Sequence, residues 1–180
     1  MKFVVLDRDG VINYDSPNFI KSPEEWKPIP GSLEAIASLN QAGFRVVLAT
    51  NQSGLERGLF DMATLNAIHD KMSRLLLHNG GRIEALFYCP HSSESGCECR
   101  KPKPGLLREI ALRFNIDLRG VPNIGDSLRD LQCAAEVGGL PILVKTGKGK
   151  KTEANGGLPE NTLIFDDLAQ AAQHLITHAQ

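Results

Sequence analysis

The residues of this chain best suited to chemistry are two aspartates near its N-terminus. Asp7-Arg8-Asp9-Gly10 directly follows the apolar run Phe3–Leu6, which has the composition of a buried strand. Alternate side chains of a strand project to the same face, so we expect Asp7 and Asp9 on one side and Arg8 pointing away. Two like charges this close require a cation or a shared proton. The motif therefore predicts a carboxylate site at a strand end, with an ordinary Asp-Gly turn as the alternative.

Polar motifs also follow other candidate strands. Thr50-Asn51-Gln52-Ser53-Gly54 follows the second strand, Arg100-Lys101-Pro102-Lys103-Pro104-Gly105 follows a long loop, and Gly125-Asp126-Ser127-Leu128-Arg129-Asp130 follows the fourth strand. In a parallel sheet the ends of these strands meet at one edge, where ligands bind. Carboxylates can hold Mg²⁺, hydroxyl and amide groups can bind phosphoryl oxygens, and a lysine can neutralise charge. Together they predict a phosphoryl-transfer site.

A second cluster lies in the loop that precedes the lysine. Cys89, His91, Cys97 and Cys99 offer three thiols and one imidazole, a set suited to tetrahedral Zn²⁺ with no open position. We expect a structural zinc that folds the loop and fixes Arg100 directly after the last ligand. The alternative is a group of reduced cysteines without metal. Crowding of cysteines in one loop favours metal binding in a reducing compartment over a disulfide framework.

The elements that must position these residues alternate along the chain. Apolar runs rich in β-branched residues are separated by segments of helical period, which predicts an α/β fold with a doubly wound, mostly parallel sheet and helices on both faces. The expected strands are Phe3–Leu6, Val46–Ala49, Ala85–Tyr88, Val121–Ile124, Ile142–Val144 and Thr162–Phe165, and the expected helices are Ser32–Ala42, Met62–Leu77, Gly105–Phe114, Leu128–Val137 and Asp167–His178.

Three segments fall outside this alternation. Val11–Pro30 is rich in proline and Cys89–Pro104 contains the cysteine cluster, and we expect both to be functional loops. Gly147–Gly157 is rich in glycine and lysine, and we expect a mobile loop there. Histidines on the predicted helices, His69 among them, are expected at the surface or at its boundary and not as ligands.

Composition limits the classes of function. A chain of 180 residues with 42% hydrophobic content fits one globular domain over residues 1–180. Its net charge of -1 gives no electrostatic reason to bind nucleic acid or a membrane surface. The first apolar run is too short for a signal peptide, and no run has the length of a membrane span. We therefore expect a cytoplasmic protein.

The order of the motifs resembles that of a known group of enzymes. Asp-x-Asp-Gly, a strand ending in Thr, a Lys and Gly-Asp-x-x-x-Asp is the order of the haloacid dehalogenase (HAD) superfamily of phosphatases. With Cys89-Pro90-His91 and Cys97-Glu98-Cys99-Arg100-Lys101-Pro102, the chain is similar to the D,D-heptose 1,7-bisphosphate phosphatases and to their relatives, the histidinol-phosphate phosphatases. The resemblance implies a Rossmann-like HAD fold without a large cap domain. It also implies Mg²⁺-dependent removal of the C7 phosphate of a heptose 1,7-bisphosphate, in ADP- or GDP-heptose biosynthesis for surface polysaccharide.

The resemblance also assigns roles. Asp7 would attack phosphorus to give an aspartyl phosphate, and Asp9 would protonate the leaving oxygen and then activate water. Mg²⁺ would be held by Asp7, the backbone carbonyl of Asp9 and Asp126. Thr50 and Lys101 would hold the transferring phosphoryl group.

Other positions have less definite roles. Asp130 would position Lys101 or a metal-bound water, and Lys103 is a second lysine near the site, although the family match selects Lys101. Arg57 is either a ligand of a distal phosphate or a solvated side chain. The resemblance gives as substrate-binding positions Asp15, Ser16, Pro17, Asn18, Asn51, Gln52, Ser53, Arg100 and Lys101.

Alternatives remain at this point. A histidinol-phosphate phosphatase would share the nucleophile and zinc motifs. A non-catalytic receiver-like signalling domain would place its phosphorylated aspartate after the third strand, whereas Asp7 follows the first. A zinc-dependent binding module would leave the aspartates unexplained. We expect a monomer with a small sugar bisphosphate as its partner, and the sequence does not decide between the α and β anomers.

Overall fold

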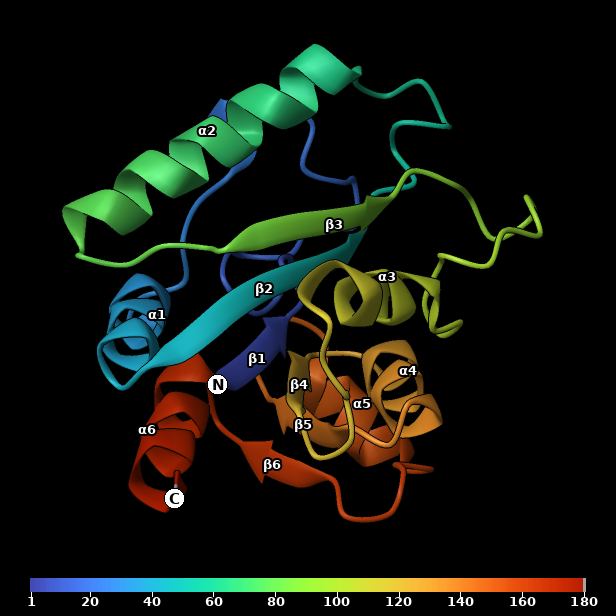
Figure 1. The fold of residues 1–180 in the computed structure, drawn as a ribbon. Coiled ribbons are helices and arrows are strands. Elements are labelled where there is room, and N and C mark those ends of the chain that lie inside the picture. The colour runs from blue at the N-terminus through green and yellow to red at the C-terminus, as the bar shows by residue number, and fades with distance from the viewer. Residues whose placement is uncertain (180) are drawn as a thin grey trace.

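A parallel sheet of six strands in the order β3-β2-β1-β4-β5-β6 forms the centre of the computed structural model, which describes residues 1–179 (Figure 1). The strands are β1 (Lys2–Leu6), β2 (Phe44–Asn51), β3 (Ala85–Cys89), β4 (Pro122–Gly125), β5 (Leu140–Val144) and β6 (Leu163–Phe165). The helices are η1 (Pro23–Glu25, a 3₁₀ turn), α1 (Ser32–Gln41), α2 (Met62–His78), α3 (Gly105–Phe114), α4 (Leu128–Glu136), α5 (Gly149–Asn155) and α6 (Leu168–His178). The predicted α/β class and doubly wound parallel sheet are confirmed.

The order in which strands are added to the sheet reverses at β1, which pairs with β2 on one side and β4 on the other. Leu6 is in register with Leu48 of β2 and with Ile124 of β4. The residues that follow these three positions therefore meet at the carboxyl edge of the sheet. Such a switch point is where open α/β sheets bind ligands.

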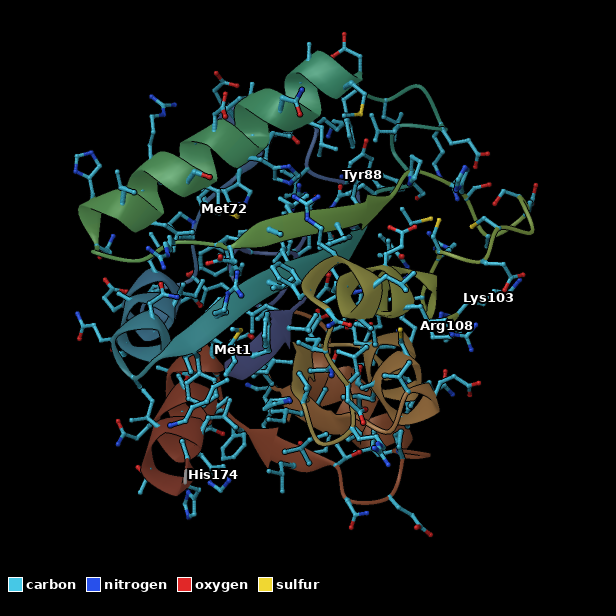
Figure 2. All side chains as sticks on the ribbon, viewed as in Figure 1. Met1, Met72, Tyr88, Lys103, Arg108 and His174 are labelled. Atoms are coloured by element: carbon cyan, nitrogen blue, oxygen red, sulfur yellow. The ribbon has the colours of Figure 1, made fainter. Side chains whose placement is uncertain are left out.

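Both faces of the sheet are covered, which explains why its strands are continuously apolar. Val4 and Leu6 of β1 face the larger core cluster, which contains side chains of α1, α2 and α6. Phe3 and Val5 face the opposite cluster, which contains side chains of α3 and α4. In Figure 2, Met72 of α2 lies between that helix and the sheet, where it is buried. The two clusters thus fix the sheet, and with it the positions of the loops at its carboxyl edge.

The proline-rich segment 11–30 is held on the helix side of the site. Trp26 is fully buried in the larger core cluster. Lys71 of α2 donates hydrogen bonds from Nζ to the carbonyl oxygens of Pro23 and Trp26, both at 2.7 Å. These contacts give a loop of little regular structure a defined course past the site.

Two expectations about the elements need correction. β2 is longer than the predicted Val46–Ala49, because Thr50 and Asn51 pair with Tyr88 and Cys89 of β3. The expected mobile loop Gly147–Gly157 is wrong, since it contains α5. This helix is fixed to the site from within, because the buried Thr152 hydroxyl donates to the backbone carbonyl of Asp126 at 2.8 Å.

No helix within residues 1–179 has both the length and the apolar character needed to cross a bilayer.

Candidate active site

A pocket at the carboxyl edge of β1, β2 and β4 brings the predicted motifs together. Twelve of the thirteen candidate residues outside the cysteine cluster line it, and Asn18, which is exposed, does not. Five further residues of the wall were not themselves assigned to the site, or only as an alternative. The full lining is Asp7, Asp9, Asp15, Ser16, Pro17, Phe19, Ile20, Thr50, Asn51, Gln52, Ser53, Arg57, Arg100, Lys101, Asp126, Arg129 and Lys148.

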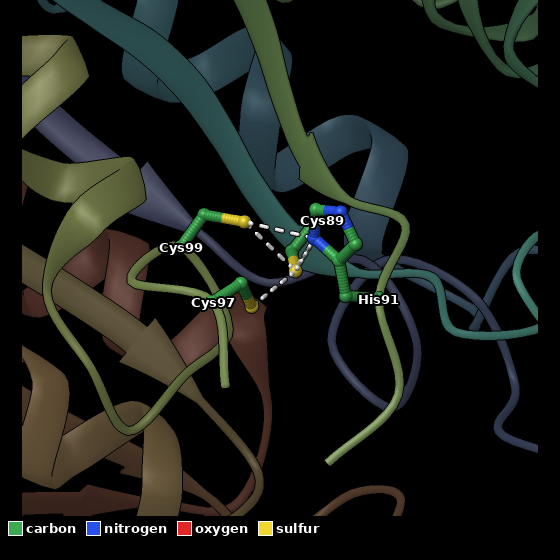
Figure 3. Close-up of side chains that lie close together, drawn as sticks. All are labelled: Cys89, His91, Cys97 and Cys99. Atoms are coloured by element: carbon green, nitrogen blue, oxygen red, sulfur yellow. Dashed lines mark hydrogen bonds between the residues drawn. The ribbon is translucent and has the colours of Figure 1, made fainter. Parts of the chain in front are cut away.

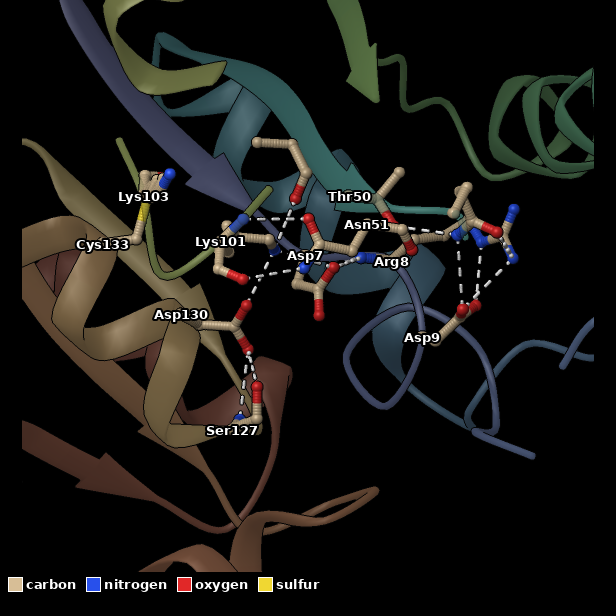
Figure 4. A network of polar contacts seen from close by, with 12 residues as sticks. Asp7, Arg8, Asp9, Thr50, Asn51, Lys101, Lys103, Ser127, Asp130 and Cys133 are labelled. Carbon is tan, nitrogen blue, oxygen red and sulfur yellow. Dashed lines mark hydrogen bonds and ion pairs between the residues drawn. The ribbon is translucent and has the colours of Figure 1, made fainter. Parts of the chain in front are cut away.

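Lys101 lies at the base of this pocket with all three ammonium protons engaged. Its Nζ lies 3.1 Å from Asp7 Oδ1 and 2.7 Å from Asp130 Oδ1, and donates to the carbonyl oxygen of Ala49 at 2.8 Å (Figure 4). Asn51 fixes the lysine backbone, because its side-chain amide bonds to both the N–H and the carbonyl of Lys101. Burial opposes the charge, yet Asp130 and Asp7 raise the pKa of Lys101 above its ordinary value. The lysine is therefore a permanent buried cation beside Asp7.

The second candidate lysine lies elsewhere. Lys103 is 48% exposed and pairs with Glu98 at 3.3 Å on the surface. Figure 4 shows it next to Cys133, whose thiol donates to the Lys103 carbonyl, and away from the carboxylates. The geometry thus selects Lys101 over Lys103 as the lysine of the pocket.

Three buried carboxylates surround the position next to Lys101. One oxygen each of Asp7, Asp126 and Asp130 lies within 4.8 Å of the others. Burial and the neighbouring charge of Asp130 raise the pKa of Asp7 to about 6, and burial with Asp130 and Asp7 raises that of Asp126 to about 8. Asp130 has Lys101 as its counter-ion, whereas Asp126 forms no ion pair within residues 1–179. This excess of negative charge, provided by oxygen ligands, fits a hard cation such as Mg²⁺.

The turn before α5 holds Asp126 and the neighbouring Gly10 in place. The Lys148 N–H donates to Asp126 Oδ2 at 2.9 Å, and the Thr146 hydroxyl donates to the Gly10 carbonyl at 2.6 Å. Gly10 has φ 83°, and a Cβ there would overlap the Asp126 carboxylate. Only glycine allows the chain to pass this close to the acidic group.

Asp9 is bonded to Arg8 and lies apart from the three carboxylates of Asp7, Asp126 and Asp130. Asp7 and Asp9 both line the pocket and Arg8 does not, as expected. The Arg8 side chain nevertheless bonds to Asp9: its Nε donates to Asp9 Oδ1 at 2.8 Å and its Nη2 to Oδ2 at 3.2 Å. Burial alone would raise the pKa of Asp9, but the guanidinium and the amides of Asn13 and Gln52 lower it below its ordinary value.

Gln52 and Thr50 complete this side of the site. The Gln52 amide donates to Thr50 Oγ1 at 2.9 Å and to Asp9 Oδ2 at 3.4 Å, while its oxygen accepts from Arg8 at 3.3 Å. Gln52, a predicted substrate-binding residue, lines the pocket, and its amide also links three side chains there. The Thr50 hydroxyl is buried at the end of β2 and lines the pocket beside Asp7.

Three guanidinium groups form the outer wall. Arg57 lies over the Phe19 ring at 5.7 Å, Arg100 donates to the His91 carbonyl at 3.2 Å, and Arg129 has a buried Nε without a hydrogen-bond partner. None of the three pairs with a carboxylate of residues 1–179. Burial and the neighbouring charges of Arg129 and Arg57 lower the pKa of Arg100. Arg129 also lies in the first turn of α4, where a cation is unfavourable. The wall therefore has unneutralised positive charge suited to an anion.

The sequence indicated only part of this wall. Arg129 lies between Asp126 and Asp130 of the Gly-Asp-x-x-x-Asp motif, and this position was the sequence signal for its place in the wall. Lys148 belongs to a basic run with Lys145, Lys150 and Lys151, which predicts either attraction of an anionic substrate or a solvated loop. Its place in the pocket wall could not be predicted, because α5 was not expected. Lys148 Nζ lies 3.6 Å from Asp15 Oδ2, which joins the turn before α5 to the loop 15–20 across the pocket.

The cysteine cluster forms a separate site beside the pocket. Cys89 Sγ lies 3.6 Å from His91 Nδ1, 3.7 Å from Cys97 Sγ and 3.0 Å from Cys99 Sγ, and Cys99 Sγ lies 3.5 Å from His91 Nδ1 (Figure 3). A tetrahedral zinc with bonds of about 2.3 Å to sulfur separates its ligands by about 3.5–3.8 Å. Most of these spacings match, and Cys133 lies apart as a buried thiol. The donor set fits a closed zinc site whose loop leads directly into Arg100 and Lys101.

Known proteins share this chain's sequence and fold. The HAD-hydrolase-like family profile matches residues 98–171, and that of the polynucleotide kinase 3 phosphatases matches residues 2–127. D-glycero-beta-D-manno-heptose-1,7-bisphosphate 7-phosphatases from Bordetella bronchiseptica and Pseudomonas putida are 62% and 56% identical, over 99% and 98% of this chain and 100% of each relative. The crystal structure of D,D-heptose 1,7-bisphosphate phosphatase from B. bronchiseptica, complexed with magnesium and phosphate, has a TM-score of 0.98 and 61% identity, covering 99% of this chain and 100% of that one. The enzyme from Burkholderia thailandensis has a TM-score of 0.80 and 54% identity, covering 98% and 99%.

Proposed function

Because this chain belongs to the HAD phosphatases, in the group of the heptose-bisphosphate phosphatases, we propose that it removes the C7 phosphate of D-glycero-D-manno-heptose 1,7-bisphosphate and releases heptose 1-phosphate. The relatives named as 7-phosphatases of this bisphosphate match over nearly the whole chain. The reaction would serve ADP- or GDP-heptose biosynthesis for surface polysaccharide, in the cytoplasm.

The observation that carries the substrate proposal is the presence of two cationic regions in one pocket. Lys101 lies at the base beside Asp7, and Arg57, Arg100 and Arg129 form the outer wall without carboxylate partners in the described chain. Guanidinium groups bind phosphate through paired hydrogen bonds. A substrate with a phosphate at each end satisfies both regions, whereas histidinol phosphate leaves the outer one unfilled.

The chemistry at the base follows from the residues there. An Asp7 oxygen attacks phosphorus, a P–O bond forms as the bond to the sugar oxygen breaks, and the phosphoryl group is left on Asp7. Asp9 donates a proton to the departing oxygen, then accepts one from the water that hydrolyses the acyl phosphate. Lys101 and Thr50 stabilise the charge on the phosphoryl oxygens throughout. Asp130 positions Lys101, to which it is bonded at 2.7 Å.

Magnesium would be held by Asp7, the backbone carbonyl of Asp9 and Asp126, and when bound it would neutralise charge between Asp7 and the phosphate dianion. The buried and mutually repelling carboxylates of Asp7 and Asp126 support this assignment. Zinc in the cluster of Cys89, His91, Cys97 and Cys99 would have a structural role only, since all four positions are filled by protein ligands.

The loop 15–20 and the residues after β2 would shape the sugar end of the pocket. Asp15, Ser16 and Pro17 line it from one side, and Ser53 lines it from the other. We also propose that the enzyme acts as a monomer, because no cap or partner is needed to bring these residues together.

Phosphate release by the purified protein with Mg²⁺ tests the proposal. We expect kcat/KM for heptose 1,7-bisphosphate to exceed that for heptose 7-phosphate and for histidinol phosphate. R57M and R100M should each lower kcat/KM for the bisphosphate by about tenfold or more, the size of a lost charged hydrogen bond, and leave the heptose monophosphate nearly unaffected. A preference for histidinol phosphate, or equal losses for both heptose substrates, would contradict the proposed use of the outer wall.

A further inference from the structure

Arg8 is a fully buried cation whose role is not explained by the fold alone. Its side chain is 0% exposed, although an arginine is rarely buried completely. Three side chains accept from its guanidinium: Asp9 through Nε and Nη2, Gln52 through Nη2, and His69 through Nη1. The guanidinium thus links His69 of α2 to the Asp9 carboxylate, and Figure 4 shows its bonds to Asp9.

His69 reaches the Arg8 guanidinium from α2, far from the motifs of the active site. Its Nε2 lies 3.1 Å from Arg8 Nη1. Arginine has donors and no acceptor, so His69 must be neutral with its proton on Nδ1 in order to accept this bond. Burial and the charge of Arg8 lower the pKa of His69 to about 3, which agrees with a permanently neutral ring. Within residues 1–179, His69 is the hydrogen-bond partner of Arg8 Nη1.

The two oxygens of Asp9 are held unequally by this arrangement. Oδ1 accepts from Arg8 at 2.8 Å and from Asn13 at 2.9 Å. Oδ2 has longer contacts, 3.2 Å to Arg8 and 3.4 Å to Gln52. Oδ2 is therefore the oxygen more available to exchange a proton, and the plane of the Arg8 guanidinium determines where it lies.

We propose that His69 is a positioning residue for the reaction: by accepting from Arg8 Nη1 it fixes the guanidinium that orients the Asp9 carboxylate toward the leaving oxygen. The proposal rests on the proposed function in taking Asp9 as the acid. Without the imidazole, Arg8 Nη1 is left without that acceptor, and a buried guanidinium turns to recover a hydrogen bond. Displacement of Asp9 by a fraction of an ångström reduces proton transfer, because it depends on near-contact geometry.

The leaving group of the substrate distinguishes positioning from general damage. A sugar alkoxide must be protonated as it leaves, whereas p-nitrophenolate leaves without a proton. Because kcat/KM reports the first irreversible step, it isolates the acid role of Asp9 from its later role as a base. We would measure kcat/KM for heptose 1,7-bisphosphate, glycerol 3-phosphate and p-nitrophenyl phosphate in the wild type, H69L, H69Q and D9N, with H78L as the control at an exposed position of the same helix.

For H69L we expect kcat/KM to fall about tenfold for both alkyl phosphates, the effect of one hydrogen bond to a charged group, with little change for p-nitrophenyl phosphate. H69Q, whose amide oxygen can accept from Arg8, should recover most of the loss. D9N should give the same pattern more strongly, and H78L should match the wild type. Thermal unfolding of each variant shows whether the fold is retained.

Two results would overturn the proposal: equal losses of H69L for alkyl and aryl phosphates without recovery in H69Q, or no loss at all. Failure of the proposed function gives a different result. In that case the wild type hydrolyses heptose 1,7-bisphosphate no better than glycerol 3-phosphate, while the contrast between alkyl and aryl phosphates still tests His69. A wild type without activity on any alkyl phosphate would overturn both proposals, since Asp9 would then have no leaving oxygen to protonate.

Discussion

Replacement of Lys101 by methionine removes one charge from the base of the pocket and keeps nearly the same side-chain length. Lys101 Nζ makes three contacts of 2.7, 2.8 and 3.1 Å, two of them to the carboxylates of Asp130 and Asp7. In K101M both carboxylates stay buried without their shared cation. Removal of one partner of a buried ion pair costs about 3–5 kcal/mol. We expect the free energy of unfolding to fall by that amount.

The same substitution should strongly reduce catalysis. The ammonium group lies 3.1 Å from Asp7, the proposed nucleophile, and would face the transferring phosphoryl group. Loss of one preorganised donor at such a position lowers kcat by about 10²–10³. The Lys101 charge also keeps the pKa of Asp7 from rising further above about 6. In K101M a larger fraction of Asp7 is therefore protonated at neutral pH, which adds to the loss.

K103M is the matched control, because Lys103 is two residues away and has the same side chain. It is 48% exposed and pairs with the exposed Glu98. Exposed pairs of this kind contribute about 0.2–1 kcal/mol, so both stability and activity should stay close to those of the wild type. Urea unfolding and steady-state phosphate release measure the two quantities. The reasoning is refuted if K103M loses as much activity as K101M, or if K101M keeps more than about a tenth of the wild-type kcat.

Three further outcomes follow from the structure. Unfolded aspartates ionise near pH 3.8, whereas Asp7 and Asp126 have folded pKa values of about 6 and 8. The Mg²⁺-free protein should therefore lose thermal stability as pH rises from about 4 to 8. Added Mg²⁺ should raise Tm more at pH 8 than at pH 5. Metal analysis should find one zinc per chain, lost in C97S and retained in C133S because the latter thiol is apart from the cluster; zinc retained in C97S would refute the four-ligand site. G10A should fold but require far more Mg²⁺ for activity, since the added Cβ overlaps the Asp126 carboxylate, and an unchanged Mg²⁺ titration would contradict this.

Much of the fold could be predicted because it depends on local patterns. The continuous apolar strands and the amphipathic helices between them are visible in the sequence, and their alternation predicts a parallel sheet with helices on both faces. The helix α5 could not be predicted in this way. It is a short helix in a segment rich in glycine and lysine, and a tertiary hydrogen bond from Thr152 to Asp126 fixes it to the site.

The candidate site divides along the same line. Asp7 and Asp126 directly follow β1 and β4, and Thr50 is the second-last residue of β2. A parallel sheet brings such positions together whatever the details of the loops. The bonds of Arg8 to Asp9 and His69 could not be predicted, and His69 comes from a helix with no motif at that position. Contacts between distant segments depend on packing, which a single sequence does not display.

The most direct test of the central claim is the phosphorus NMR spectrum of heptose 1,7-bisphosphate during reaction with the enzyme and Mg²⁺. We predict that the resonance of the C7 phosphate disappears as inorganic phosphate forms, while that of the C1 phosphate remains, and that D7N produces no change. Loss of the C1 phosphate first, or turnover by D7N equal to that of the wild type, would contradict the account.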